Sequence, residues 1–225
     1  MFNIKKIDLL RVNRLFKDVL LSKISTMNLA EKSQAVMILF EKLSLESKQF
    51  AEQSGLGCIS GCGACCANPE VSASPLEFLP LAFDFFNKGL GDTILTLLDS
   101  EEENKSCISY RAHSIDGMNG YCTNYANRGL ICRLFAATAR KNKYGLKELI
   151  ICKKLKNEKP EQFTETSLRI NSDLEVPLAS KYYQLIQEID DPLARQYPIN
   201  TAIRLALESV MRFKFYEEDA LVPVD

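Results

Sequence analysis

Four of the eight cysteines in this chain lie within nine residues, in the pattern Cys58-x-x-x-Cys62-x-x-Cys65-Cys66. Thiolates this close together repel one another, and a bound metal ion or cluster is the usual source of compensating positive charge. The pattern therefore predicts a metal site, provided that the cysteines are not paired as disulfides.

The sequence outside the cysteine cluster indicates a reducing compartment, in which disulfides are rare. Charged residues interrupt the apolar ones throughout the first 25 positions, leaving no signal-peptide core and no small-residue cleavage site. No later run approaches the roughly 20 apolar residues that cross a bilayer. We therefore expect a cytoplasmic protein with no transmembrane segment. In a reducing cytoplasm, closely spaced cysteines are more often metal ligands or redox groups than disulfides, and Cys65 and Cys66 could pair only with strain.

The composition is that of an ordinary globular protein, with 225 residues, 46% hydrophobic and 25% charged, and a net charge of -1. This balance does not favour nucleic acid as a partner. We predict a single domain over 1–225, with N-terminal helices in 1–54, a cysteine-cluster metal-binding core in 55–155 and C-terminal helices in 156–225. The basic first 25 residues fit a helix packed on this domain better than a membrane-surface helix. A protein partner, a substrate and the oligomeric state are not indicated.

Helical patterns dominate on both sides of the cysteines. Asn28 and Glu31 form a capping pattern, followed by an apolar stripe toward Gly55. Ser74-Pro75-x-Glu77 predicts a second helix start, with Glu77 as its cap and Gly89 at its end. Further helices are expected at 92–99, 178–189 and 200–213, a long irregular loop at 105–135, and a strand or helix at 147–155. The predicted fold class is mainly α, a small helical domain with an irregular cysteine-rich metal-binding loop region and room for one short strand pair.

The spacing of the first four cysteines also limits their geometry. On one continuous helix the outer two would lie roughly 12 Å apart along the axis, too far for one metal ion. Glycines at 57, 61 and 63 permit a loop around Cys58 and then a short helical turn carrying Cys62, Cys65 and Cys66. Because Cys65 and Cys66 diverge by about 100° around a helix, we favour an iron-sulfur cluster, of the 4Fe-4S type, over zinc.

Two blocks of sequence carry a resemblance to a known family. The first is the Cys58 to Cys66 pattern followed by Val71-Ser72-x-x-Pro75-x-Glu77, and the second runs from Cys107 through Gly120-Tyr-Cys122 to Cys132-Arg133-Leu-Phe135. Together they resemble the YkgJ-like cysteine-cluster proteins, described as a zinc- or iron-chelating domain. Arg128-Gly129 stands where that family has Arg-Pro. The resemblance covers about a third of the chain and implies metal binding by cysteines rather than a particular reaction.

The predicted metal ligands are Cys58, Cys62, Cys65, Cys66, Cys107, Cys122 and Cys132. Cys152 lies on an apolar run and is predicted to be a buried hydrophobic residue, and His113 is predicted to be an exposed loop histidine. Arg128 and Arg133 either offset thiolate charge, hydrogen-bond the sulfurs or form surface ion pairs. Tyr125 is expected to pack its ring under the loop, with contact to the metal ligands as the alternative.

Three functions fit these residues. The first is a metal-binding cysteine-cluster protein that chelates an iron-sulfur cluster or zinc. The second is an iron-sulfur-dependent enzyme, in electron transfer or similar to a protein lysine N-methylase. The third is a thiol redox or metal-carrier protein. No Gly-x-Gly-x-x-Gly and no Walker loop is present, and the sequence identifies no catalytic or cofactor-binding residues.

Overall fold

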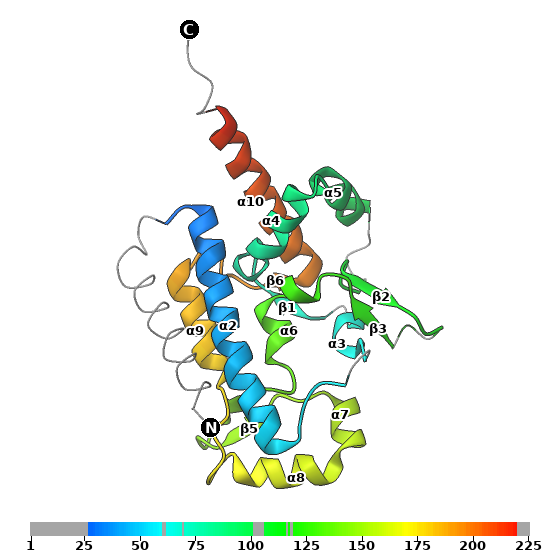
Figure 1. Cartoon of the computed structure of the whole chain (residues 1–225), viewed down its shortest axis with the longest axis vertical. Helices are drawn as coiled ribbons and strands as arrows, with labels where there is room; N and C mark the ends of the chain where they lie inside the picture. Colours follow the sequence, from blue (N-terminus) through cyan, green and yellow to red (C-terminus); the bar gives the residue numbers. More distant parts are fainter. Residues whose placement is uncertain are drawn as a thin grey trace, which may run out of the picture.

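A computed structural model describes residues 27–59, 62–68, 70–100, 106–115, 117 and 119–219 of the chain (Figure 1). The described part is mainly helical, which confirms the predicted fold class. The helix expected in the first 25 residues and the acidic run at 101–103 lie outside the described residues. No helix in the described part is long and apolar enough to cross a membrane.

Short strands and two 3-10 turns accompany the helices. The helices are α2 (Leu29–Ser54), α3 (Ala64–Ala67), α4 (Leu79–Asn87), α5 (Gly91–Ser100), α6 (Leu130–Leu134), α7 (Lys153–Glu158), α8 (Pro160–Arg169), α9 (Ala179–Ile189) and α10 (Ile199–Asp219), with 3-10 turns η2 (Leu76–Phe78) and η3 (Tyr125–Asn127). The strands pair antiparallel as β1 (Ser72–Ala73) with β6 (Tyr197–Pro198), β2 (Tyr110–Ala112) with β3 (Gly120–Cys122), and β4 (Ala139–Lys141) with β5 (Lys147–Leu149). The expectation of one strand pair is thus exceeded within the described residues.

Helix α2 runs along the molecule and leads into the first cysteines (Figure 1). Its start is the predicted capping box, in which the Glu31 amide donates to Asn28 at 2.9 Å and the Asn28 amide donates to Glu31 at 2.8 Å. Its end is Gly55, whose φ of 68° is the left-handed conformation that stops a helix. Local sequence therefore determines both ends of α2.

The main core lies between α2, α4, α9 and α10. Leu39 and Leu43 of α2 are fully buried there, as are Leu207 and Val210 of α10. Burial of each such side chain contributes about 1.5–3 kcal/mol. The predicted helices at 92–99, 178–189 and 200–213 are confirmed as α5, α9 and α10.

A smaller second core lies at the C-terminal end of α2. Phe50 of α2 packs there with Ala139 of β4 and with Ile170 and Leu174, which follow α8. In Figure 1, α7 and α8 lie at this end of the molecule. Among the cysteines, Cys107 belongs to the main core, and Cys66 and Cys132 pack against it.

Two expectations need correction. The segment 105–135 is not one irregular loop, because it contains the β2–β3 hairpin and α6. Residues 147–155 are neither one strand nor one helix, since β5 ends at Leu149 and α7 begins at Lys153.

Candidate metal centre

A cavity of about 710 Å³ lies between the C-terminal half of α2, the segment 57–66, the β2–β3 hairpin and α6. All the cysteines predicted as ligands line this cavity, although they come from two stretches of chain separated by α4 and α5. They are Cys58, Cys62, Cys65, Cys66, Cys107, Cys122 and Cys132. The fold thus brings both cysteine segments to one place.

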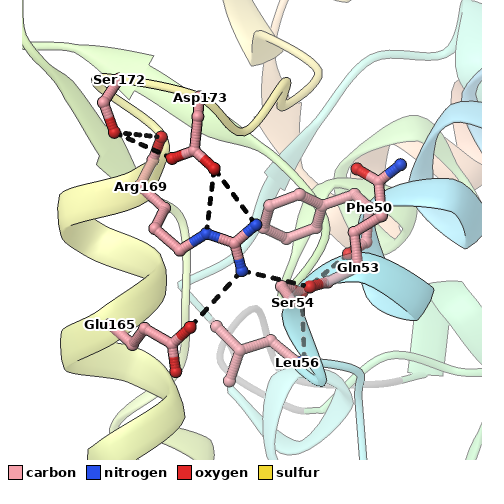
Figure 2. Close-up of polar contacts among 8 residues, drawn as sticks. All are labelled: Phe50, Gln53, Ser54, Leu56, Glu165, Arg169, Ser172 and Asp173. Atoms are coloured by element: carbon pink, nitrogen blue, oxygen red, sulfur yellow. Dashed lines mark hydrogen bonds and ion pairs between the residues drawn. The ribbon is translucent and has the colours of Figure 1, made fainter.

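The end of α2, from which the first cysteine segment starts, is held by α8 (Figure 2). Arg169 donates from Nη1 to the carbonyl oxygen of Gln53 at 3.5 Å. Its guanidinium is in turn held by the carboxylates of Glu165 and Asp173, each 3.4 Å away. The position of the α2 terminus therefore depends on residues more than a hundred positions further along the chain.

The backbone then turns toward the cavity. Lys159 donates to the carbonyl oxygen of Gly55 at 2.9 Å, which links the turn after α2 to the start of α8. Cys58 follows and is exposed, whereas Cys62 is buried. The Cys62 amide donates to the carbonyl of Ile59 at 3.2 Å.

Gly63 sets the direction of α3. Its φ is 62°, and a Cβ at this position would lie 2.6 Å from the ring of Tyr110. Glycine is therefore required both by the backbone and by the close approach to the hairpin. The sequence predicted a helical turn carrying Cys62, Cys65 and Cys66; the helix carries only Cys65 and Cys66, because the left-handed residue places Cys62 before it.

The second cysteine segment is joined to the first by a backbone hydrogen bond. The Cys107 amide donates to the carbonyl of Cys66 at 3.1 Å. Cys107 precedes β2, while Cys122 ends β3 and pairs with Tyr110 across the hairpin. Cys132 lies in α6 and also lines the cavity.

Glu77 links α6 to the rest of the site. This fully buried carboxylate accepts from the amide and hydroxyl of Ser74 at 2.6 and 3.0 Å, and its other oxygen accepts from the Ile131 amide at 2.9 Å. It therefore caps both η2 and α6, whereas the sequence predicted only the first of these roles. Burial raises the pKa of the Glu77 carboxyl, and the hydrogen bonds from Ile131 and Ser74 act in the opposite direction.

The thiols themselves are poorly ionised without a cation. Burial, aided by neighbouring thiols, raises the pKa of Cys65 and of Cys107 to about 12 and that of Cys66 to about 11. Burial also raises the pKa of Cys132 well above its ordinary value. A metal reverses this preference, because a coordinated thiol is deprotonated outright.

Arg128 supplies positive charge at the cavity wall. It lowers the pKa of Cys66 and Cys122, opposing the effect of burial. Its guanidinium lies 3.8 Å from the centre of the Tyr125 ring and donates to the Tyr125 carbonyl at 3.0 Å. Arg133 donates from Nε to the Arg128 carbonyl at 3.0 Å, so this second arginine holds the loop.

Sequence reasoning placed Tyr125 and Cys152 wrongly. Tyr125 was expected to pack under the loop, but this residue is 62% exposed. Cys152 is the second of these residues. It was predicted to be a buried hydrophobic residue, but it is half-buried at the N-cap of α7, where its Sγ accepts from the Leu155 amide at 3.4 Å. Its charge raises the pKa of both Cys58 and Cys65, so it lies near the first segment. Only tertiary structure brings it there, and no spacing rule would have found it. His113 is exposed, as expected.

Within the described ranges, no group of three or more histidine, cysteine, aspartate and glutamate side chains forms a ready-made metal site. The cysteines instead surround a shared cavity. Their chemistry nevertheless fits the metals in question, because thiolate sulfur is the donor of structural zinc sites and of iron-sulfur clusters.

Comparison with known proteins agrees with this chemistry. No curated protein and no solved structure matches the chain. A family model named CxxCxxCC, described as "Putative zinc- or iron-chelating domain", matches residues 57–165, a range that contains all eight cysteines. The match supports metal binding and confirms the resemblance to a cysteine-cluster family. Just under half of the chain, residues 57–165, is therefore similar to the CxxCxxCC family.

Proposed function

We propose that this protein holds an iron-sulfur cluster, of the 4Fe-4S type, through its cysteine thiolates, with zinc as the alternative metal. The observation that carries the proposal is the shared cavity, where seven cysteines from two separate segments meet. The role is structural in the first instance, because the metal fixes the hairpin and α6 against the end of α2.

The choice of an iron-sulfur cluster is supported by the directions of the sulfurs. Cys65 and Cys66 are consecutive residues of α3, so their side chains diverge by about 100°. A single zinc needs four sulfurs converging at about 2.3 Å, whereas a cluster presents several irons to ligands from different directions. The cavity of about 710 Å³ also leaves room for a group larger than one ion.

The chain's own residues prepare this site in three ways. Gly63 directs α3 at the hairpin, Glu77 holds α6, and Arg128 offsets part of the thiolate charge. The metal, when bound, supplies the remaining positive charge. Binding draws the thiols inward from the cavity wall, so it is coupled to a local closure of both segments.

Anaerobic purification followed by metal and sulfide analysis tests the proposal. We expect brown protein with broad absorbance near roughly 400 nm and matching amounts of iron and acid-labile sulfide. Colourless protein with bound zinc and no sulfide would overturn the cluster, and protein without either metal would overturn the proposal as a whole.

A ligand variant adds a second test. Cys62→Ser should lower the metal content and the melting temperature, because it removes a buried sulfur from the site. Ser180→Ala, at an exposed position on α9, is the matched control and should leave both unchanged. Equal metal content in the two variants would contradict the role of Cys62.

One observation favours an enzymatic use of the same site. Ser47 lines the cavity from α2, and its buried Oγ has no hydrogen-bond partner among the described residues. An unpaired buried hydroxyl beside a cavity of ligand size is typical of a site that binds a further molecule. An iron-sulfur-dependent enzyme, in electron transfer or in methyl transfer to a protein lysine, is therefore the second candidate.

Calorimetry with S-adenosylmethionine tests the methyl-transfer form of this second candidate. A binding heat that is lost in Ser47→Val would support it, since valine fills the position without offering a hydrogen bond. If the metal-loaded protein showed neither a binding heat nor a shift in melting temperature, the methyl-transfer function would be excluded.

A further inference from the structure

One side of the cavity is formed by a single face of α2, and we call it the α2 wall: Ser44, Ser47, Lys48 and Ala51. These positions follow the i, i+3, i+4 and i+7 spacing of neighbours on one face of a helix. The Oγ of Ser47 is buried in this wall and, among the described residues, has no hydrogen-bond partner. Because an unpaired buried hydroxyl costs free energy, its position on a cavity indicates a hydrogen bond to a ligand.

Arg133 of α6 reaches the α2 wall across the cavity lining. Its Nη1 donates to the Oγ of Ser44 at 3.3 Å, its Nη2 to the Ala126 carbonyl at 2.6 Å and its Nε to the Arg128 carbonyl at 3.0 Å. The guanidinium also lies 4.4 Å from the centre of the Phe40 ring of α2. Its position is therefore fixed before a ligand binds, and the described residues occupy only three of its five N–H groups.

Apart from the cysteine thiols, the charged side chains on the cavity lining are all cationic. Lys48, Arg128 and Arg133 line the cavity, whereas no aspartate or glutamate does so in the described part of the chain. None of the three forms an ion pair with a carboxylate among the residues that the structure describes. The whole chain has a net charge of -1, so this is a local concentration of positive charge. Such a cavity attracts anions and repels cations.

The thiolates of a metal centre do not account for this arrangement at the α2 wall. The hydrogen bonds of Arg133 go to α2 and to loop carbonyls, and none of them goes to a sulfur of a described cysteine. Lys48 and Ser47 lie on α2, a helix without cysteines. These three side chains are therefore hydrogen-bond donors beside the cysteines, available to a second ligand.

We propose that the α2 wall and Arg133 bind the oxyanion group of a small molecule, a carboxylate or a phosphate, next to the metal centre. The Ser47 hydroxyl and the Lys48 ammonium donate from α2, and the remaining N–H groups of Arg133 donate from α6. Carboxylates and phosphates accept through two or more oxygens and match such a set of donors, particularly the planar fork of an arginine. The inference goes beyond the proposed function, because it names a second ligand for the cavity and holds for either metal.

Titration of the metal-loaded, full-length protein with acetate, inorganic phosphate and ethylammonium tests the inference. The melting temperature is measured while each ion replaces sodium chloride at constant ionic strength. We expect a saturable rise with acetate, with phosphate or with both, and none with ethylammonium. The larger of the first two rises distinguishes a carboxylate site from a phosphate site. No saturable rise with either anion, or an equal rise with ethylammonium, would overturn the inference. Metal analysis of the same samples tests the proposed function separately.

Substitutions on the α2 wall show where the anion binds. Ser47→Ala should raise the Kd by about tenfold or more, because a hydrogen bond to a charged group is lost. Lys48→Gln should raise it by about two- to fivefold, because Lys48 is exposed and its ion pair is screened by solvent.

These two variants should fold, since neither substitution leaves a protein partner without its hydrogen bond. Lys141→Gln, at an exposed lysine of β4 outside the cavity, is the matched control and should leave the Kd unchanged. General stabilisation by phosphate is the same in all these proteins and cancels in the comparison. A Kd for Ser47→Ala equal to that of the wild type, or an equal loss of affinity in Lys48→Gln and Lys141→Gln, would show that the anion binds elsewhere.

Discussion

Replacement of Glu77 would test how the fold holds the second cysteine segment. In Glu77→Ala the buried amide of Ser74 and the part-buried amide of Ile131 lose their acceptor, and each unsatisfied donor costs about 1–3 kcal/mol. The expected fall in the free energy of unfolding is therefore about 2–6 kcal/mol. Glu77→Gln keeps the shape and one acceptor oxygen but turns an NH₂ toward the other donor, so we expect about 1–3 kcal/mol.

Urea unfolding of the metal-loaded variants measures these values, with release of metal to a chelator as a second readout. Glu77→Ala should release metal faster, because α6 carries Cys132 and loses its N-terminal acceptor, and Glu77→Gln should show a smaller effect in the same direction. Glu175→Gln, at an exposed carboxylate, is the matched control and should stay within about 0.5 kcal/mol of the wild type. If Glu77→Ala behaved like this control, the double capping role of Glu77 would be refuted.

Three further predictions concern other parts of the chain. Gly63→Ala should lower the free energy of unfolding in urea by about 2–4 kcal/mol, because its Cβ would overlap the hairpin. Gly145 has a similar positive φ in open space, so Gly145→Ala should cost less. Equal costs would contradict the close approach of Gly63 to the hairpin. Burial and then the 2.7 Å hydrogen bond to Glu46 raise the pKa of the Tyr182 hydroxyl. The neutral Tyr182 therefore contributes its full stabilisation below pH about 10, and this stabilisation is lost as the pH rises further. Tyr182→Phe should therefore flatten the loss of stability between pH 9 and 11 in thermal melts, and an unchanged slope would count against this. Asn28→Ala removes the capping box of α2 and should lower the free energy of unfolding by about 1 kcal/mol in the same urea assay. An unchanged free energy would mean that water satisfies the freed amides as well as Asn28 does.

The elements that could be predicted from the sequence are those whose ends are determined by residues close together in the chain. Asn28, Glu31 and Gly55 determine the ends of α2 by contacts within a few residues, so the pattern could be recognised without the rest of the fold. The β2–β3 hairpin was missed because each strand has only three residues and is held partly by a tertiary contact. The Cys107 amide, shortly before β2, donates to the carbonyl of Cys66 at 3.1 Å.

The same difference between local and long-range contacts applies to the cysteine site. The spacing of the first four cysteines pointed to metal chemistry, and the structure brings these residues together with Cys107, Cys122 and Cys132 at one cavity. The positions of Cys152 and of the second oxygen of Glu77 could not be predicted, because each depends on a partner more than fifty residues away in the chain. Contacts between residues so far apart in the chain have no characteristic spacing that a sequence pattern could reveal.

The hydrogen bond between Cys107 and Cys66 marks a point where metal ligation would act as a cross-link. A metal that binds both segments closes a loop of about 40 residues, and by the chain-entropy relation used for disulfides such a closure destabilises the unfolded chain by about 4 kcal/mol. That is a large part of the stability of a typical domain. On the proposed function, the persistence of the folded protein would then follow the supply of metal in its surroundings.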